Sequence, residues 1–164
     1  GIMLVVIILI IGSTLGREIM AGRQPGLGSF ALIHFAGYLF FLLMPVEALV
    51  PYYLVAGDSA LVLIGLSVGT ALLAQTIDFT IGWVVSERVV DSLITRAKFD
   101  KFKATFSRWG GWAIFMMNLL PLSSPNMLLV SGIMRYSRIK AMSISAAGLV
   151  LKYVVIVLLT DAVG

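Results

Sequence analysis

The chain of 164 residues contains no cysteine and a single histidine, His34. The absence of cysteine excludes disulfides, thiol catalysis and cysteine-bound iron–sulfur clusters. One histidine is too few for a histidine-based zinc site. Charged residues are also scarce, at 12% of the sequence, whereas 60% of the residues are hydrophobic. A soluble domain of this size cannot bury so much apolar surface, so the composition predicts a single all-α polytopic membrane domain over residues 1–164.

The apolar residues form segments separated by polar breaks, at 2–15, 27–57, 60–85, 110–134 and 141–160. The first predicts an N-terminal transmembrane helix. The third and fifth are each long enough for a membrane span of about 20 residues. The second and fourth are interrupted by prolines at Pro45, Pro51, Pro121 and Pro125.

Proline lacks a backbone N–H and clashes with the preceding helical turn, so a straight helix is not expected to continue through two of them. We therefore predict that 27–57 and 110–134 break at their prolines and fold as re-entrant helical hairpins. The stretches "MPVEALVPYYLVAGD" and "LPLSSPNMLLVSGI" also resemble each other. With 27–85 and 110–160 as the two repeats, each hairpin is followed by a long transmembrane helix, a pattern typical of transporter folds.

Basic residues gather in two polar breaks, 86–109 and 135–140. The positive-inside rule places both breaks in the cytoplasm. Both ends of 110–134 are then cytoplasmic, and 27–57 opens to the other side, so the repeat is inverted. We predict a multi-pass protein of a prokaryotic plasma membrane. The net charge of +4 reflects this topology rather than nucleic-acid binding.

Residues 86–109 also predict a basic amphipathic helix that lies on the inner leaflet and contacts anionic headgroups. The alternative is a helix that binds a partner protein. Gly65 and Gly69 predict close helix packing.

Polar residues inside the apolar segments are the candidates for binding a substrate or an ion. They are Glu47, Asp78, Asn118, Ser124, Asn126 and Lys152. A charged side chain at mid-bilayer costs about 2.5–3.5 kcal/mol on insertion scales, so such residues usually line a cavity or pair with one another. The alternatives are an internal charge pair that locks the helices, amides and hydroxyls that only cap helix ends, and a satisfied or interfacial imidazole at His34.

Broken helices supply two binding features. Free N–H groups at a helix start favour an anion such as a phosphate, and unwound carbonyls favour a cation. Glu47, placed in the first break, could carry a proton or bind Na⁺ while a polar headgroup occupies the cavity. No other cofactor is expected. A membrane enzyme is not expected either, because the chain shows no metal cluster and no nucleophile beside a base.

The order of short motifs resembles the DedA family, also called the VTT or SNARE-associated Golgi protein domain, over roughly residues 30–160. The motifs are "P-x-E…AG" in the first hairpin, Asp78 followed by Gly82, a basic stretch, "F-x-R-x-G" (Phe106, Arg108, Gly110) and a proline-broken hairpin that ends in "SG". The resemblance implies two re-entrant hairpins that meet at mid-membrane. It also implies that Glu47 and Asp78 match the family's acidic residues, and that the protein moves lipids between leaflets.

One part of the family pattern is absent. Bacterial members carry arginines around the second break, in a pattern like R-F-x-P-x-x-R, where this chain has Asn118 and Ser124. Arginine is a bidentate clamp for phosphate, so its replacement favours a zwitterionic phospholipid, contacted through helix ends and Lys152, over a tightly held polyprenyl phosphate.

These observations together predict a lipid flippase or scramblase that moves a phospholipid or polyprenyl-phosphate headgroup through a polar cavity. Its partners are membrane lipids, with a homo-oligomer as a further expectation and H⁺ or Na⁺ as candidate coupling ions. The alternatives are an ion-coupled transporter of a small soluble solute and a membrane scaffold without transport activity.

Overall fold

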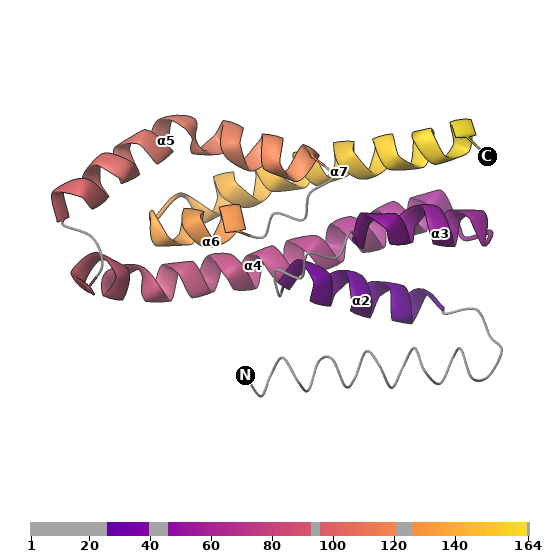
Figure 1. Cartoon of the computed structure of the whole chain (residues 1–164), viewed down its shortest axis with the longest axis horizontal. Helices are drawn as coiled ribbons and strands as arrows, with labels where there is room; N and C mark the ends of the chain where they lie inside the picture. Colours follow the sequence, from indigo (N-terminus) through magenta and orange to yellow (C-terminus); the bar gives the residue numbers. More distant parts are fainter. Residues whose placement is uncertain (1–25, 40–45, 93–95, 121–125, 164) are drawn as a thin grey trace.

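The computed structural model describes residues 26–39, 46–92, 96–120 and 126–163 (Figure 1). Every regular element in these ranges is a helix: α2 (Leu27–Leu39), a 3₁₀ turn η1 (Val46–Ala48), α3 (Leu49–Val55), α4 (Ala60–Ser92), α5 (Arg96–Leu119), α6 (Asn126–Ile133) and α7 (Arg138–Val163). The all-α prediction is confirmed for this part of the chain. The predicted helix 2–15 lies outside the described residues.

Two helices are long and apolar enough to cross a membrane, judged by length and composition: Ala60–Ser86 within α4 and Arg138–Ala162 within α7. They match the predicted long helices 60–85 and 141–160. Each exceeds the roughly 20 residues that span the hydrocarbon core. The chain therefore has two candidate transmembrane helices, in agreement with a membrane protein.

The shorter helices pack around α4 and α7 in a reciprocal pattern. The helix before each break packs on the long helix of its own half, α2 on α4 and α5 on α7, and α4 and α7 also contact each other. The helix after each break packs on the long helix of the other half, α6 on α4 and α3 on α7. Figure 1 shows α2 and α3 at the end of the molecule that also holds the C-terminus, whereas α5 and α6 reach in from the opposite end.

The two halves also share a backbone motif where α3 and α6 end. Gly57 (φ 101°) and Arg135 (φ 56°) are left-handed, each two residues after the last helical residue. In both places the left-handed residue donates its N–H to the carbonyl three residues back, and the next residue donates to the carbonyl five residues back, as in a Schellman motif. The next long helix begins three positions later in both cases (57 to 60 and 135 to 138).

The predicted break at Pro51 is wrong. Pro51 lies within α3, as the third residue of the helix. The first N–H groups of a helix have no partner within the helix, so a proline there loses no hydrogen bond. Within the first apolar segment the structure describes α2 up to Leu39 and η1 from Val46 onward. Pro45 itself lies outside the described residues.

The predicted amphipathic linker 86–109 is not a separate element. Its first residues continue α4 to Ser92, and its later residues belong to α5, which runs through Gly110 and Gly111 to Leu119. The sequence predicts a boundary at this glycine pair, yet a glycine inside a helix costs only about 1 kcal/mol. The missing Cβ is used for close approach, because one added at Gly111 would lie 3.1 Å from Cδ1 of Ile144 on α7.

The close packing predicted for Gly65 and Gly69 is not found among the described residues, because a Cβ added at either position meets none of their atoms within 4 Å. Close packing occurs instead at Gly82 on α4 and Gly132 on α6. A Cβ added to either glycine would collide with the backbone of the other helix. These two glycines allow α4 and α6 to approach closely.

Candidate functional site

A buried ion pair joins the turn before α3 to the middle of α7. Nζ of Lys152 lies 2.9 Å from Oε1 of Glu47, and the two residues are 3% and 6% exposed. Glu47 lies in the turn η1 that leads into α3, a position where a helix start favours an acidic group. The structure therefore brings together two of the predicted site residues, which lie far apart in the sequence.

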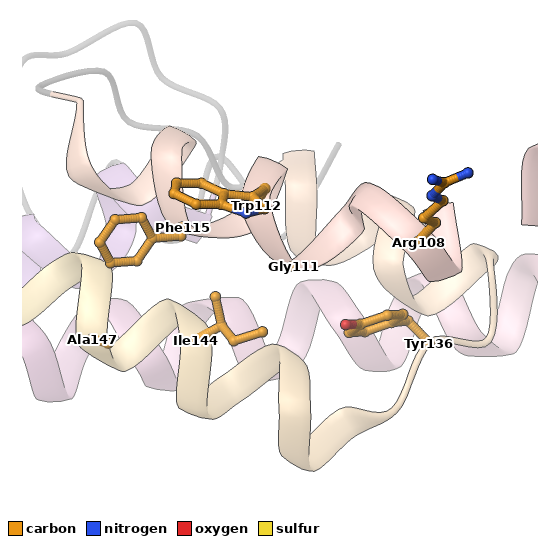
Figure 2. Close-up of a pocket in the computed structure, with 7 residues that line it drawn as sticks. All are labelled: Arg108, Gly111, Trp112, Phe115, Tyr136, Ile144 and Ala147. Atoms are coloured by element: carbon orange, nitrogen blue, oxygen red, sulfur yellow. The ribbon is translucent and has the colours of Figure 1, made fainter. Parts of the chain in front are cut away.

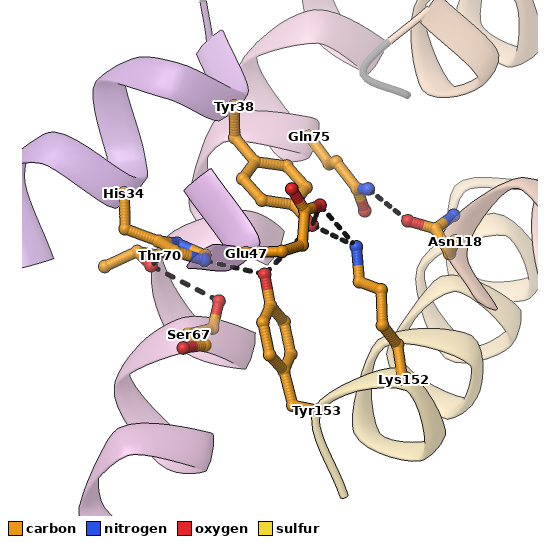
Figure 3. Close-up of polar contacts among 9 residues, drawn as sticks. All are labelled: His34, Tyr38, Glu47, Ser67, Thr70, Gln75, Asn118, Lys152 and Tyr153. Atoms are coloured by element: carbon orange, nitrogen blue, oxygen red, sulfur yellow. Dashed lines mark hydrogen bonds and ion pairs between the residues drawn. The ribbon is translucent and has the colours of Figure 1, made fainter. Parts of the chain in front are cut away.

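A chain of hydrogen bonds continues from this pair across α2, α7 and α4 (Figure 3). Lys152 donates to Oη of Tyr38 at 2.5 Å, and the hydroxyls of Tyr38 and Tyr153 are 3.1 Å apart. Oη of Tyr153 lies 2.6 Å from Nε2 of His34, and Nδ1 of His34 lies 2.8 Å from Oγ1 of Thr70. The interpretation of His34 as a satisfied imidazole holds, since both ring nitrogens have partners.

A second buried group of polar side chains joins α4, α5 and α7. Nε2 of Gln75 donates to Oδ1 of Asn118 at 2.6 Å, and Oγ of Ser145 donates to Oε1 of Gln75. Asn118 also donates to the carbonyl of Ile114, one turn back in α5. The predicted residue Asn118 is thus a hydrogen-bonded amide at the end of α5, and Figure 3 shows its bond to Gln75.

Asp78 is buried, at 2% exposed, and lies apart from the ion pair. Among the described residues, neither its Oδ2 nor Oε2 of Glu47 has a hydrogen-bond partner. The alternative of an internal charge pair is observed for Glu47 and Lys152, and within the described part of the chain Asp78 takes no part in it. Both carboxylates therefore keep one buried oxygen that no described side chain satisfies.

The register of α4 against α6 locates Asp78 beside the second break. Gly82 lies against the carbonyl of Leu129, and Oγ of Ser86, one turn further along α4, donates to the carbonyl of Ile133 at 2.7 Å. α4 and α6 therefore run parallel to each other. One turn before Gly82, Asp78 is level with the start of α6. Free N–H groups at a helix start stabilise a nearby carboxylate.

Three of the four prolines predicted as hairpin breaks, and part of the predicted site, lie outside the described residues. These are Pro45, Pro121, Pro125 and Ser124, together with the side chain of Asn126. The backbone on either side is described, with α5 ending at Leu119 and α6 beginning at Asn126.

The polar residues lie near the middle of the candidate spans. At 1.5 Å per residue, Lys152 is about 21 Å along α7 from Arg138 and about 15 Å from Ala162. Gln75 lies similarly far inside α4. The hydrocarbon core of a bilayer is about 30 Å thick, so a bilayer centred on these candidate spans would hold both side chains in its central part.

An apolar groove lies between α5 and α7 (Figure 2). Its volume is about 490 Å³, and it is lined by Arg108, Gly111, Trp112, Phe115, Tyr136, Ile144 and Ala147. Arg108 and Tyr136 are at one end of the groove and Phe115 and Ala147 at the other. That other end is one turn from Asn118, whose Cβ packs close to Gly148 of α7. The groove thus follows α5 from its basic part toward the polar residues.

Several residues of this site were not predicted from the sequence: Tyr38, Thr70, Gln75, Ser145 and Tyr153. A signal was present in their spacing. Tyr38 follows His34 by four residues, Asp78 follows Gln75 by three, and Lys152 follows Ser145 by seven, so each pair shares a helix face. Polar residues that share one face of an apolar helix indicate a buried network, even when each residue alone is uninformative.

No family model, curated protein or solved structure matches the chain. The interpretation of the site therefore rests on the chain's own residues and geometry.

Replacing Ser145 by alanine tests the second polar group. We expect the free energy of unfolding to fall by about 1–3 kcal/mol, because Oε1 of Gln75 loses its buried donor. Ser143→Ala is the matched control, since Ser143 is exposed on the same helix. The measurement is denaturant unfolding in detergent micelles, and equal effects of the two variants would show that the bond to Gln75 contributes nothing.

Proposed function

We propose that the protein is a lipid translocase, a flippase or scramblase that moves a phospholipid headgroup past the Glu47–Lys152 pair. The observation that carries the proposal is a buried, oppositely charged pair at the middle of a candidate transmembrane helix. Shielding two charged groups from water in this environment has a large desolvation free energy. Polar and ionisable groups at this depth usually mark the path of a substrate or an ion.

The charges of the pair match those of a zwitterionic headgroup. A phosphate can replace Glu47 beside Lys152, and an ammonium group can replace Lys152 beside Glu47. The exchange leaves the net charge of the centre unchanged, and the headgroup brings its own counter-charge. Oε2 of Glu47, which has no partner among the described residues, is the oxygen that can first accept a hydrogen bond from an approaching ammonium.

The groove between α5 and α7 offers a route to this centre. Arg108 at one end can pair with a phosphate near the membrane surface, and the apolar walls suit acyl chains. Asn118 is ten residues further along α5, about 15 Å at 1.5 Å per residue. That distance is half of a 30 Å hydrocarbon core. We propose that the headgroup passes from Arg108 to Asn118 and then to Lys152.

The proposal includes the inverted repeat of two re-entrant hairpins and the likeness to the DedA family. Their support is the reciprocal packing of α3 and α6 on the opposite long helices and the repeated junctions at Gly57 and Arg135. In this scheme the protein is a multi-pass protein of a prokaryotic plasma membrane. Its cytoplasmic side is the basic end, where α5 begins and α6 ends (Figure 1).

Glu47→Gln tests the function in liposomes that contain a fluorescent phosphatidylethanolamine. Dithionite quenching reports how much label reaches the outer leaflet. We expect the wild type to exchange the label and Glu47→Gln to exchange it about tenfold more slowly or worse, because the neutral amide cannot form the charge-assisted bond to the headgroup ammonium, which is worth about 1.5–3 kcal/mol. Asp100→Asn is the control, since Asp100 is exposed on α5.

The proposal would be contradicted if the wild type exchanged the fluorescent lipid no faster than protein-free liposomes do. Uptake of a soluble solute under an ion gradient, without movement of the lipid label, would select the solute transporter instead.

A further inference from the structure

We propose that the hydrogen-bonded chain from Lys152 through Tyr38 and Tyr153 to His34 is a proton-transfer path that couples the opening of the ion pair to protons. The inference rests on the proposed lipid translocation, and it names the proton as the coupling ion. This inference adds a direction to the hydrogen bonds around the ion pair. The contacts determine which group donates and which accepts in each bond from Lys152 to His34.

The order begins at Thr70, whose single hydroxyl proton points to the carbonyl of Leu66 at 2.7 Å. The oxygen of Thr70 therefore accepts from His34, and the proton of that bond is on Nδ1 of the imidazole. A neutral imidazole with Nδ1 protonated has Nε2 as its acceptor. Tyr153 must then donate to His34.

The same argument fixes the next bonds. Tyr153 has one proton and gives it to His34, so its oxygen accepts from Tyr38. Tyr38 also lies 3.4 Å from Oε1 of Glu47, but the contact with Tyr153 is shorter, at 3.1 Å. The oxygen of Tyr38 accepts from Lys152. All donors thus point from Lys152 toward His34.

A proton can move along this chain by successive short transfers. An N–H bond of Lys152 breaks and an O–H bond forms on Tyr38, which passes its own proton to Tyr153, and Tyr153 passes its proton to Nε2 of His34. Each tyrosine gives one proton and gains one. The imidazolium then gives its Nδ1 proton to a water molecule at Thr70, the half-buried end of the chain. Thr70 itself passes no proton on, because its own proton stays in the bond to the carbonyl of Leu66. The reverse sequence returns a proton to Lys152.

The consequence concerns the ion pair. A neutral Lys152 no longer attracts Glu47 by charge, so the carboxylate is free to bind the ammonium of a headgroup. The titratable groups that face His34 are Tyr38 from its own helix and Tyr153 from α7, with Lys152 beyond them. From α4, His34 contacts the uncharged Thr70. Glu47 reaches the imidazole only through Tyr38 and Tyr153.

The single histidine of the sequence allows a direct test that does not depend on transport. Solid-state NMR of the protein labelled with ¹⁵N-histidine in lipid bilayers distinguishes the two neutral tautomers. We expect a neutral imidazole protonated on Nδ1, with Nε2 hydrogen-bonded. Tyr153→Phe should shift the Nε2 resonance, and Tyr52→Phe, an exposed tyrosine, should not. A proton on Nε2 in the wild type, or an Nε2 signal unchanged by Tyr153→Phe, would overturn the proton path.

The second test measures leaflet exchange in liposomes with an imposed pH gradient. We expect the gradient to change the wild-type rate several-fold, and Tyr153→Phe to lose this response, measured as the ratio of its own rates with and without the gradient. Tyr52→Phe should behave as the wild type. A wild type that exchanges lipid at a rate independent of the gradient overturns the proton path and leaves the translocase intact. A wild type without exchange contradicts the translocase, and the NMR result then decides the proton path on its own.

Discussion

Lys152→Met is expected to lower the free energy of unfolding by about 3–5 kcal/mol, because it leaves the carboxylate of Glu47 buried without its counter-charge. The methionine side chain has a similar length and is apolar, so the loss of packing is small. Tyr38 also loses the donor that Lys152 provides. The measurement is unfolding in detergent micelles by increasing amounts of sodium dodecyl sulfate.

The double variant Glu47→Gln with Lys152→Met separates the cost of an unpaired charge from the value of the pair. We expect it to recover most of the lost stability, since replacing both members of a buried pair by neutral side chains is often close to neutral. A double variant as unstable as Lys152→Met would show that the loss comes from packing around α7 rather than from the orphaned carboxylate.

Gly82→Ala is expected to have the largest effect among substitutions between α4 and α6. The added Cβ would overlap the carbonyl of Leu129, which is backbone and cannot rotate away. Overpacking of this kind typically costs about 1–3 kcal/mol, and occasionally more when the backbone must shift. Gly132→Ala should act in the same way from the opposite helix, because its Cβ would meet the backbone of α4.

Gly65→Ala is the matched control on the same helix. An added Cβ there meets no atom of the described part of the chain within 4 Å, and alanine has a better helix propensity by about 0.5–1 kcal/mol. We therefore expect Gly65→Ala to be neutral or slightly stabilising. The measurement is the same detergent unfolding, and equal effects at Gly65 and Gly82 would contradict the close approach of α4 and α6.

The long helices could be predicted from the sequence because one physical property decides them. A run of about 20 apolar residues bounded by polar ones has the length of a membrane span, and α4 begins at the predicted residue, Ala60. The place of Pro51 was not predictable, because a proline can be a helix breaker or a residue of a first helical turn, and the sequence alone does not distinguish the two.

The boundary of α5 was missed for a related reason. A glycine pair and a change from basic to apolar residues suggested two elements, yet helix hydrogen bonds continue across both. Packing against Ile144 on α7 explains Gly111, and that contact is a property of the folded chain. The prediction of close packing at Gly65 and Gly69 failed among the described residues for a similar reason. Two glycines four residues apart allow close packing only where a second helix lies against them.

The candidate site was predicted in part. Glu47 and Lys152 were identified because ionisable side chains are costly in an apolar segment. Their mutual contact, and the tyrosines that join them to His34, depend on how η1, α2 and α7 come together. Periodicity can place residues on one helix face, but it does not state which faces meet. Asp78 stays a prediction as a site residue, since no partner of its buried Oδ2 is found among the described residues.

Leaflet exchange by the double variant Glu47→Gln with Lys152→Met is the most direct test of the central claim. This variant removes both charges while it is expected to keep the fold, so its activity separates a headgroup site from a structural lock. We predict stability close to that of the wild type and exchange of fluorescent phosphatidylethanolamine reduced to the rate of protein-free liposomes. A stable double variant that exchanges lipid as fast as the wild type would contradict the account.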